Sequence, residues 1–373
     1  MNSIKVMRIV LTGGGTGGHL IPLISVAKKI NEKIGAVEFL FVGPRGMLEE
    51  KLMKEEGIKI KNIFTGKMRR YFSLNNFLDL VKIPLGIFQS LWILLVFMPD
   101  AIFSKGGYAS FPVVIVGWLY RIPILIHDSD CVPGLTNSVL GKLATRIAIS
   151  YPEARKYFSP ERVILTGNPL RANISLGDPV SARSIFPLAD SKKTIFVYGG
   201  SQGSRIINES IIKILPKLLR TYQIIHQTGE KNYETVTRKA GELGIKAGHD
   251  GYFPIAFIND ELKDILAVAD LVIARAGANS ISEIAANKKP SIIIPIEHSA
   301  NNHQRMNAYS IAKIGGCVVL EESNLGEHIF LSRIEEILQN NELAGKLSQN
   351  IGQFYHSDAT EKIVQGILDM IEE

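Results

Sequence analysis

A histidine follows a run of glycines near the N-terminus of this chain, in Gly13-Gly14-Gly15-Thr16-Gly17-Gly18-His19. Glycines let a backbone turn tightly and bring its N–H groups close to a ligand, and the positive end of a following helix attracts anions. An unperturbed imidazole titrates near pH ~6.5, so a neutral His19 can accept a proton from a hydroxyl group. The run is typical of a loop that binds a phosphate or lies against a sugar, with a proton acceptor within reach.

Three alternative assignments compete for this glycine run. A Walker A loop ends in Gly-Lys-Ser or Gly-Lys-Thr, whereas this run ends in Gly18-His19. The dinucleotide-binding pattern is matched by Gly13-x-Gly15-x-x-Gly18, but it also requires an acid at the end of the second strand. Glu38 precedes the apolar run 39–42 instead of ending it, so it would lie at the wrong end of the strand. The third assignment, in which the glycines only let a helix pack on a strand, stays open.

A second glycine turn lies in the other half of the chain, at Gly199-Gly200-Ser201-Gln202-Gly203. Its backbone amides, together with Ser201 and Gln202, are suited to holding a diphosphate at the start of the helix expected over 206–219. Arg171 could add a bidentate contact to the same group.

Two further stretches carry polar groups at predicted strand ends. Glu283 follows the small residues around Ala278, and a carboxylate there can accept two hydrogen bonds from a ribose diol. A glutamate on the helix surface explains Glu283 equally well. His303 and Gln304 belong to a dense group of amide and imidazole side chains that suits sugar hydroxyls, which need paired donors and acceptors.

The sequence indicates no metal site. Asp128-Ser129-Asp130 resembles the Asp-x-Asp that carries a metal–diphosphate in one class of glycosyltransferases, but so short a pattern of common residues is unspecific. Cys131 and Cys317 are isolated, and His298 and His303 have no third ligand at matching spacing. We therefore expect no tightly bound cofactor, and a divalent cation is possible without being indicated.

A strand, a glycine turn and a helix follow one another twice along the chain. The apolar run 7–10 precedes the first turn and a helical pattern over 23–30 follows it, while the run 194–198 precedes the second turn. These repeats predict an α/β fold of two Rossmann-like domains with parallel sheets, facing each other across a central cleft. A chain of 373 residues suits two such domains, and the polar, turn-rich stretch 173–193 marks the boundary.

Composition places the chain among ordered globular proteins, with 46% apolar and 21% charged residues. A net charge of +6 favours anionic partners, which include phosphorylated ligands, nucleic acid and acidic lipid. The N-terminus lacks the pattern of a signal peptide, and the isolated cysteines fit a reducing compartment, so we expect the chain in the cytoplasm.

Residues 67–98 combine a basic cluster, Lys67, Arg69 and Arg70, with a long apolar stretch. Its most apolar part, 83–98, has about 16 residues, fewer than the roughly 20 that a spanning helix needs. A buried helix explains most of these residues. The alternative is that the exposed side of the helix and the basic cluster dock on an anionic membrane surface.

Several motifs resemble those of the MurG family of glycosyltransferases, in the same order and over almost the whole chain. They are Gly14 to His19, Gly106-Gly107-Tyr108, His127 to Asp130, Gly167-Asn168-Pro169 with Arg171, Gly199 to Gly203, and Gly277 to Glu283 with Gln304.

The resemblance implies a GT-B fold with an acceptor domain over 1–169 plus 349–373 and a donor domain over 170–348. The reaction would transfer N-acetylglucosamine from UDP-N-acetylglucosamine to the 4-hydroxyl of N-acetylmuramic acid in undecaprenyl-linked lipid I, inverting the anomeric carbon and giving lipid II. The enzyme would be peripheral, on the cytoplasmic face of the bacterial membrane, with no nucleic acid partner.

The resemblance also implies roles for single residues. His19 would be the general base. The donor side would comprise Thr16, Gly17, Gly18, Asp130, Arg171, Ser201, Gln202, Ile258, Ala278, Asn279, Ser280, Glu283, His303 and Gln304. Among these, Arg171 and Ser201 would lie near the diphosphate, Ile258 against uracil, Glu283 on the ribose and Gln304 on the sugar. The acceptor side would comprise Gly14, Gly15, Tyr108 and His127.

One motif departs from the family, which often has His-Glu-Gln-Asn where this chain has His127-Asp128-Ser129-Asp130. An amide contact to the sugar thereby becomes a carboxylate, which accepts hydrogen bonds but cannot donate them when ionised. Two rival functions remain: a UDP-N-acetylglucosamine 2-epimerase, which needs no acceptor, and a nucleotide-sugar-binding or membrane-scaffolding protein without catalysis.

Overall fold

The computed structural model describes residues 6–14, 17–66, 74–200 and 202–372. The chain forms two compact units, of which unit 1 is Met1–Arg171 with Ser357–Glu373 and unit 2 is Ala172–His356. The expected boundaries lay after residues 169 and 348, whereas the structure has them after Arg171 and His356. Which unit binds the donor and which the acceptor stays a prediction.

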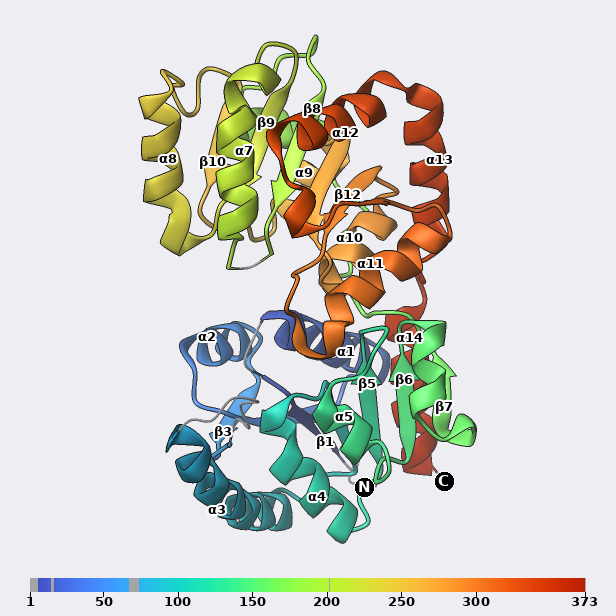
Figure 1. Cartoon of the computed structure of the whole chain (residues 1–373). Coiled ribbons are helices and arrows are strands. Elements are labelled where there is room, and N and C mark those ends of the chain that lie inside the picture. The colour runs from blue at the N-terminus through green and yellow to red at the C-terminus, as the bar shows by residue number, and fades with distance from the viewer. Residues whose placement is uncertain (1–5, 15–16, 67–73, 201, 373) are drawn as a thin grey trace. The chain divides into compact units, whose positions relative to one another are not determined.

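The described part of unit 1 contains a seven-stranded parallel sheet in the order β3-β2-β1-β4-β5-β6-β7 (Figure 1). A parallel sheet is covered on both faces, which is why its central strands are apolar runs such as the fully buried Ile9 to Leu11. Thr12 is paired with both Val42 and Ser104, so the turns after β1, β2 and β4 lie at one edge of the sheet. The strands are β1 (Met7–Thr12), β2 (Val37–Gly43), β3 (Lys59–Asn62), β4 (Ala101–Ser104), β5 (Ile124–Asp128), β6 (Arg146–Ile149) and β7 (Val163–Leu165).

Helices cover both faces of this sheet. One face packs against α1 and α14, and the other against α3, α4 and α5. These helices are α1 (Gly17–Ile34), α3 (Leu74–Phe97), α4 (Phe111–Leu119), α5 (Leu135–Leu140) and α14 (Ala359–Glu372), and α2 (Met47–Glu55) packs beside α1. The short helices are η1 (Tyr108–Ser110), η2 (Pro152–Tyr157) and η3 (Pro160–Arg162). Helix α1 begins at Gly17, within the glycine run that precedes the helical pattern over 23–30, so His19 lies within its first turn.

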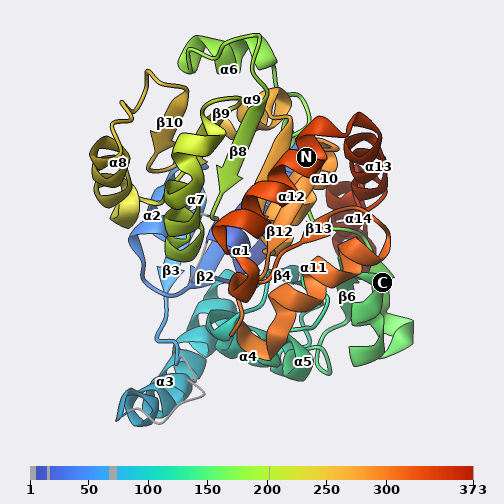
Figure 2. The ribbon, with the colours of Figure 1, turned by 45° about the horizontal axis from the view of Figure 1, so that its top comes forward.

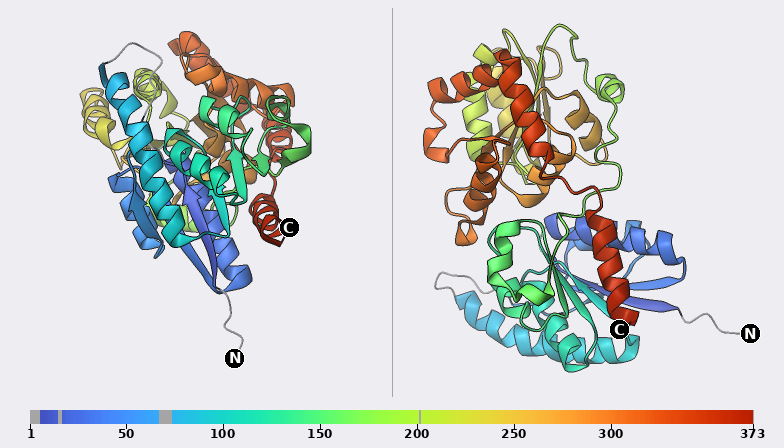
Figure 3. Two further views of the ribbon diagram at one scale, coloured as in Figure 1. Left: turned by 90° about the horizontal axis from the view of Figure 1, so that it is seen from below. Right: turned by 90° about the vertical axis from the view of Figure 1, so that its right-hand side faces the viewer.

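The C-terminal helix α14 belongs to unit 1 although the whole of unit 2, Ala172–His356, precedes it in the chain. Figure 3 shows it in red beside the strands of unit 1. The Lys33 ammonium group donates to Gln365 Oε1 at 2.7 Å, and Arg146 Nη1 lies 3.1 Å from Asp369 Oδ2. The buried face of α14, which includes Ile363 and Ile367, completes one hydrophobic core of unit 1.

The described part of unit 2 contains a six-stranded parallel sheet in the order β10-β9-β8-β11-β12-β13. The strands are β8 (Thr194–Tyr198), β9 (Gln223–Gln227), β10 (Tyr252–Ile255), β11 (Leu271–Arg275), β12 (Ser291–Ile294) and β13 (Val318–Val319). One face of this sheet shares a hydrophobic core with the helices α7 (Arg205–Leu218), α8 (Tyr233–Glu242), α12 (Glu327–Gln339) and α13 (Asn341–Gly352). Figure 2 shows α7 and α12 in front of the sheet.

The helices of unit 2 are α6 (Pro179–Ile185), α7 (Arg205–Leu218), α8 (Tyr233–Glu242), α9 (Leu262–Val268), α10 (Ala278–Ala286), α11 (His303–Lys313), α12 (Glu327–Gln339) and α13 (Asn341–Gly352). The short helices are η4 (Glu230–Asn232), η5 (Ala300–Asn302) and η6 (Glu322–Asn324). The expected strand, glycine turn and helix therefore occur in both units. Of the helices in the described ranges, none has the length and apolar character required to cross a bilayer.

Candidate active site

His19 is held by the glycine turn that precedes it. Its Nδ1 lies 2.7 Å from the carbonyl oxygen of Gly14, which can only accept a hydrogen bond. Nδ1 therefore carries the ring proton, and a neutral imidazole in this tautomer has its lone pair on Nε2. Nε2 is therefore the atom of His19 suited to take a proton from a bound hydroxyl group.

The turn after β4 packs against the His19 ring. Gly107 has φ +82°, and a Cβ built on it would lie 3.0 Å from Cε1 of His19. Glycine is thus required at 107 for two reasons, its backbone conformation and its contact with the ring. The ends of β1 and β4, neighbours in the sheet, together determine where the imidazole lies.

The environment of His19 favours its neutral form. Its pKa is lowered, and the largest cause is removal of the ring from water by the surrounding protein. The carbonyl of Gly14 opposes this shift, the positive charge of Lys105 adds to it, and the carboxylate of Asp130 opposes it again. A neutral imidazole at pH 7 is what a general base requires.

The other predicted residues around this turn are placed as follows. Gly17 and Gly18 are partly exposed in the first turn of α1, and Tyr108, also partly exposed, opens η1. Gly14 has φ +148°, and a Cβ there would lie 3.0 Å from Cδ of Pro44, so a larger residue would be crowded. Gly15 and Thr16 lie outside the described residues.

His127, predicted on the acceptor side, is fully buried. Its Nδ1 lies 2.7 Å from the ammonium nitrogen of Lys105, and its Nε2 lies 3.0 Å from the carbonyl oxygen of Gly167. These contacts occupy both ring nitrogens of the buried His127, and its role on the acceptor side stays a prediction. Asp130, which follows β5, is partly exposed, and its backbone N–H donates to Asp128 Oδ1 at 3.0 Å.

The glycine turn of unit 2 connects β8 to α7. Gly203 has φ +71°, and a Cβ on it would lie 1.9 Å from the carbonyl oxygen of Thr228, so only glycine fits. Ser204 caps the helix by accepting a hydrogen bond from the N–H of Ile207 at 3.4 Å. Gln202 is exposed at this turn, while Ser201 lies outside the described residues. Arg171, the last residue of unit 1 before the crossing, is partly exposed.

Glu283 is buried, with 4% of its surface exposed, so it is not a glutamate of the helix surface. It lies on α10, and the Tyr198 hydroxyl at the end of β8 donates to its Oε2 at 3.2 Å. Ala278, Asn279 and Ser280 form the first turn of the same helix, after Gly277. The structure thus brings the carboxylate of Glu283 beside the strand that leads into the glycine turn.

Gln304 supports the turn between β12 and α11. Its Oε1 accepts a hydrogen bond from the N–H of Ile296 at 3.2 Å, which leaves its NH₂ as the donor end. His303, at the start of α11, and Ile258, in the turn after β10, are both partly exposed.

An ion pair that was not predicted from the sequence holds the turn between β12 and α11. Arg275 Nη2 at the end of β11 lies 2.6 Å from Glu322 Oε1, and both side chains are about 10% exposed. The other oxygen of Glu322 accepts the N–H of Glu297 at 3.2 Å. Lys105 was missed as well, although a lysine between a buried strand and two glycines was a signal available in the sequence.

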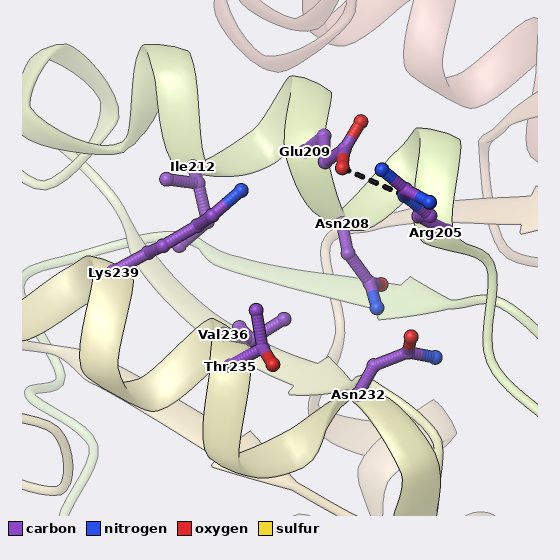
Figure 4. A pocket seen from close by; sticks show the side chains of 8 residues that line it. All are labelled: Arg205, Asn208, Glu209, Ile212, Asn232, Thr235, Val236 and Lys239. Atoms are coloured by element: carbon purple, nitrogen blue, oxygen red, sulfur yellow. Dashed lines mark hydrogen bonds and ion pairs between the residues drawn. The ribbon is translucent and has the colours of Figure 1, made fainter.

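Across the described ranges, no three His, Cys, Asp or Glu side chains are grouped so that they could hold a metal ion. A cavity of about 260 Å³ lies between α7 and α8, and Figure 4 shows its lining, with the ion pair of Arg205 and Glu209 at one end. None of the predicted site residues lines this cavity. Its lining residues are Arg205, Asn208, Glu209, Ile212, Asn232, Thr235, Val236 and Lys239.

Comparison with known proteins gives consistent results in both halves of the chain. Residues 9–149 match the family model "Glycosyltransferase family 28 N-terminal domain", and residues 194–363 match "Glycosyltransferase family 28 C-terminal domain". A relative from Clostridium perfringens is 34% identical over 370 residues, covering 99% of this chain and 98% of its own. It is named UDP-N-acetylglucosamine--N-acetylmuramyl-(pentapeptide) pyrophosphoryl-undecaprenol N-acetylglucosamine transferase.

Two solved structures are similar in fold. MurG of Acinetobacter baumannii has a TM-score of 0.74 and 24% identity, with 97% of this chain and 99% of that chain covered. A UDP-GlcNAc 2-epimerase from Neisseria meningitidis has a TM-score of 0.68 and 13% identity, with 97% and 100% covered. At these identities the likeness is one of fold alone.

Proposed function

Because the chain belongs to glycosyltransferase family 28, we infer that it transfers N-acetylglucosamine from UDP-N-acetylglucosamine to lipid I, giving lipid II. The observation that carries this conclusion is the match with the Clostridium perfringens transferase, which extends over nearly the full length of both chains. The two parallel-sheet units and the two family-model matches also confirm the predicted GT-B fold class. Lipid I is the undecaprenyl-pyrophosphoryl-N-acetylmuramoyl-pentapeptide acceptor, and the reaction serves peptidoglycan synthesis.

The decisive assay follows radiolabelled N-acetylglucosamine from the donor into a lipid product. We expect the label in lipid II only when lipid I is present. Conversion of the donor alone to a 2-epimer would support the rival epimerase, whose fold is similar. Binding of UDP without UDP release in the presence of acceptor would support a non-catalytic protein.

The donor is expected to bind unit 2. The turn 199–204 ends at the N-terminus of α7, where backbone N–H groups and the helix dipole favour a diphosphate. Ser201, Gln202 and Arg171 would contribute side-chain donors to the leaving UDP. Ile258 would lie against uracil, and Ala278 to Ser280 would let the sugar nucleotide approach the start of α10.

The chemical step is expected to be a single displacement at the anomeric carbon. The 4-hydroxyl oxygen of N-acetylmuramic acid forms the new bond to this carbon, the bond to the diphosphate oxygen breaks, and UDP leaves with the electron pair. The configuration inverts from α to β. His19 Nε2 takes the hydroxyl proton, since Nδ1 already donates to Gly14.

Glu283 would accept hydrogen bonds from the ribose of the donor. Replacing Glu283 by glutamine keeps its size but removes the charge, and we expect UDP to bind about 10- to 100-fold more weakly. Calorimetric titration with UDP measures this. Glu234→Gln, an exposed residue of α8 in the same unit, is the control and should bind UDP like the wild type. Equal affinity of Glu283→Gln and the wild type would remove Glu283 from the ribose site.

An apolar stripe on α3 is the surface that we propose for membrane contact. Val81, Leu85, Phe88, Trp92 and Leu95 recur every three or four residues and are all exposed, Phe88 by 71% and Trp92 by 69%. A helix that lies in a membrane interface buries such an aromatic and aliphatic face among the lipid head groups. The helix thus has an outer apolar stripe in addition to the buried face that packs on the sheet.

The end of α4 extends this stripe. Trp118 and Leu119 are exposed there, and the hydroxyl of Tyr120 donates to the carbonyl of Leu91 on α3 at 3.2 Å. The basic cluster Lys67, Arg69 and Arg70 lies outside the described residues, immediately before α3. We propose that the apolar stripe and this cluster together hold the enzyme on the anionic, cytoplasmic surface of the membrane, where the lipid acceptor is found.

Replacing Trp92 by glutamate is expected to weaken binding to vesicles of anionic phosphatidylglycerol about 10-fold or more, because a large apolar contact is lost. Co-sedimentation with the vesicles measures this. Val180→Glu, on α6 of unit 2 and 70% exposed, is the control for adding a charge and should bind normally. Charge reversal at Lys67, Arg69 and Arg70 should also weaken binding without reducing turnover of a soluble lipid I analogue. Unchanged vesicle binding in these variants would contradict the membrane proposal.

A further inference from the structure

Lys105 is a buried lysine at the end of a central strand. Only 2% of its surface is exposed, although lysines are almost never fully buried unless they are paired. It follows β4 directly, and the pairing of Ser104 with Ile126 brings it beside His127 on β5. Its ammonium nitrogen lies 2.7 Å from Nδ1 of His127.

This contact determines the state of His127. An ammonium group can only donate, so Nδ1 of His127 accepts and its ring proton is on Nε2. Nε2 in turn donates to the carbonyl of Gly167 at 3.0 Å, and the Ser150 hydroxyl lies 3.4 Å from the same nitrogen. Burial and the charge of Lys105 hold the pKa of His127 well below its usual value, so the pair carries a single positive charge, on Lys105.

A second chain of contacts supports the glycine turn that follows Lys105. Asn137 donates to Asp128 Oδ2 at 2.9 Å, and Asp128 Oδ1 accepts the N–H of Asp130. Gly106 has φ +80°, and a Cβ on it would lie 2.1 Å from Oδ1 of Asn137, so the turn lies directly on this amide. Gly107, the next residue, is the one that contacts the His19 ring.

Lys105 is also joined to the turn that carries His19. Its backbone N–H donates to the carbonyl of Thr12 at 2.9 Å, and a Cβ on Gly13 would lie 3.2 Å from Cβ of Lys105. The side chain therefore lies beneath both glycine turns of unit 1, between His127 and the residues that position His19. Nothing in the donor site or in the general-base step accounts for a buried cation there.

The charged groups around Lys105 shift one another's pKa values. Burial lowers the pKa of Lys105 to about 8, against the opposing carboxylates of Asp128 and Asp130. Burial and the charge of Asp130 raise the pKa of Asp128 to about 6, against Asn137 and Lys105. Glu49, a buried residue of α2, lies near the glycine turn that follows β1, since a Cβ on Gly14 would lie 3.4 Å from its Oε1. Lys105 is thus a cation that opposes the carboxylates of Asp128 and Asp130, and the charges of Lys105 and Asp130 both act on His19.

We propose that Lys105 is a positioning residue for the transfer reaction: held on His127, it fixes the turn that contacts the His19 ring and sets the charge that this ring faces. Removal of the cation takes away the charge that opposes Asp130 at the His19 ring, and the remaining negative charge favours the protonated imidazole, which cannot act as a base. This inference rests on the proposed role of His19 as the general base. Separate measurements on Lys105 and His19 variants distinguish a failure of this inference from a failure of that role.

Two variants of the full-length enzyme separate charge from contact. Lys105→Gln keeps a donor for Nδ1 of His127 but removes the charge, and Lys105→Met removes both. The His19 ring is followed by NMR titration of histidines labelled at Cε1, with the His19 signal identified from its absence in His19→Ala. We expect its titration midpoint to rise in both variants and kcat at pH 7 to fall at least 10-fold. The affinity for UDP should stay within twofold of the wild type.

The outcomes are distinct. A His19 midpoint that is unchanged in folded Lys105→Gln would overturn the proposal, whatever the effect on turnover. Parallel losses of kcat, UDP affinity and melting temperature would also overturn it, because they indicate a structural role alone. If His19→Ala retains full turnover while the midpoint still moves in Lys105→Gln, the proposed role of His19 fails and the influence of Lys105 on the ring stands.

Discussion

Replacing His19 by alanine is expected to lower kcat by about 10²- to 10⁴-fold, the usual contribution of a positioned general base. The structure gives the physical reason. Nδ1 is engaged by Gly14 at 2.7 Å, so the lone pair lies on Nε2, and the pKa of the ring is lowered so that this lone pair is available at pH 7. The affinity for UDP should barely change, because the donor is expected to bind unit 2. Single-turnover kinetics with saturating donor and lipid I measure the loss.

The pH dependence of the wild type provides a second measure of the same residue. A pKa below the ordinary value of 6.5 in the free enzyme predicts a kcat/KM that is level above neutral pH and falls on the acid side, with a midpoint below 6.5. This acid limb should be absent from the residual activity of His19→Ala. His249→Ala, a histidine of unit 2 away from the predicted site, is the control and should keep both the rate and the limb. Equal losses of turnover and UDP binding in His19→Ala would make His19 a structural or donor-site residue.

Replacing Gly203 by alanine is expected to disrupt the turn that we propose for the diphosphate. A non-glycine residue at φ +71° costs about 1–2 kcal/mol. The overlap of its Cβ with the carbonyl of Thr228, at 1.9 Å, adds about 1–3 kcal/mol of crowding. We expect a lower free energy of unfolding and a loss of UDP affinity of at least 10-fold. Denaturant unfolding and calorimetry measure the two quantities.

Gly200 offers a matched control in the same turn. Its φ is +84°, but a Cβ on it would meet nothing within 4 Å, so Gly200→Ala should cost only the conformational part, about 1–2 kcal/mol. The comparison isolates the close approach of the turn to Thr228. Equal destabilisation by the two substitutions would show that this approach is not what requires glycine at 203.

The elements of this fold were predictable because their signals are local. Apolar runs that end in glycine turns gave the central strands of both sheets, and the repeat of that pattern indicated two α/β units. His19 was found in the same way, since its chemistry and the glycines before it are adjacent in the sequence. The start of α1 was predictable in the same way, since the stretch 11–22 contains the end of a strand, the glycine turn and the first turn of the helix.

The burial of polar side chains was decided by the tertiary structure. Glu283 could equally be a surface residue from its sequence, and only the packing of α10 beside β8 buries it against Tyr198. His127 and Lys105 are 22 residues apart, and their contact exists because β4 and β5 are neighbours in register. Periodicity shows which side chains share a face, but strand order and register decide which charges meet. That is why the sequence alone determined two glycine-turn α/β units with a candidate base, while the contact between Lys105 and His127 appeared only in the folded chain.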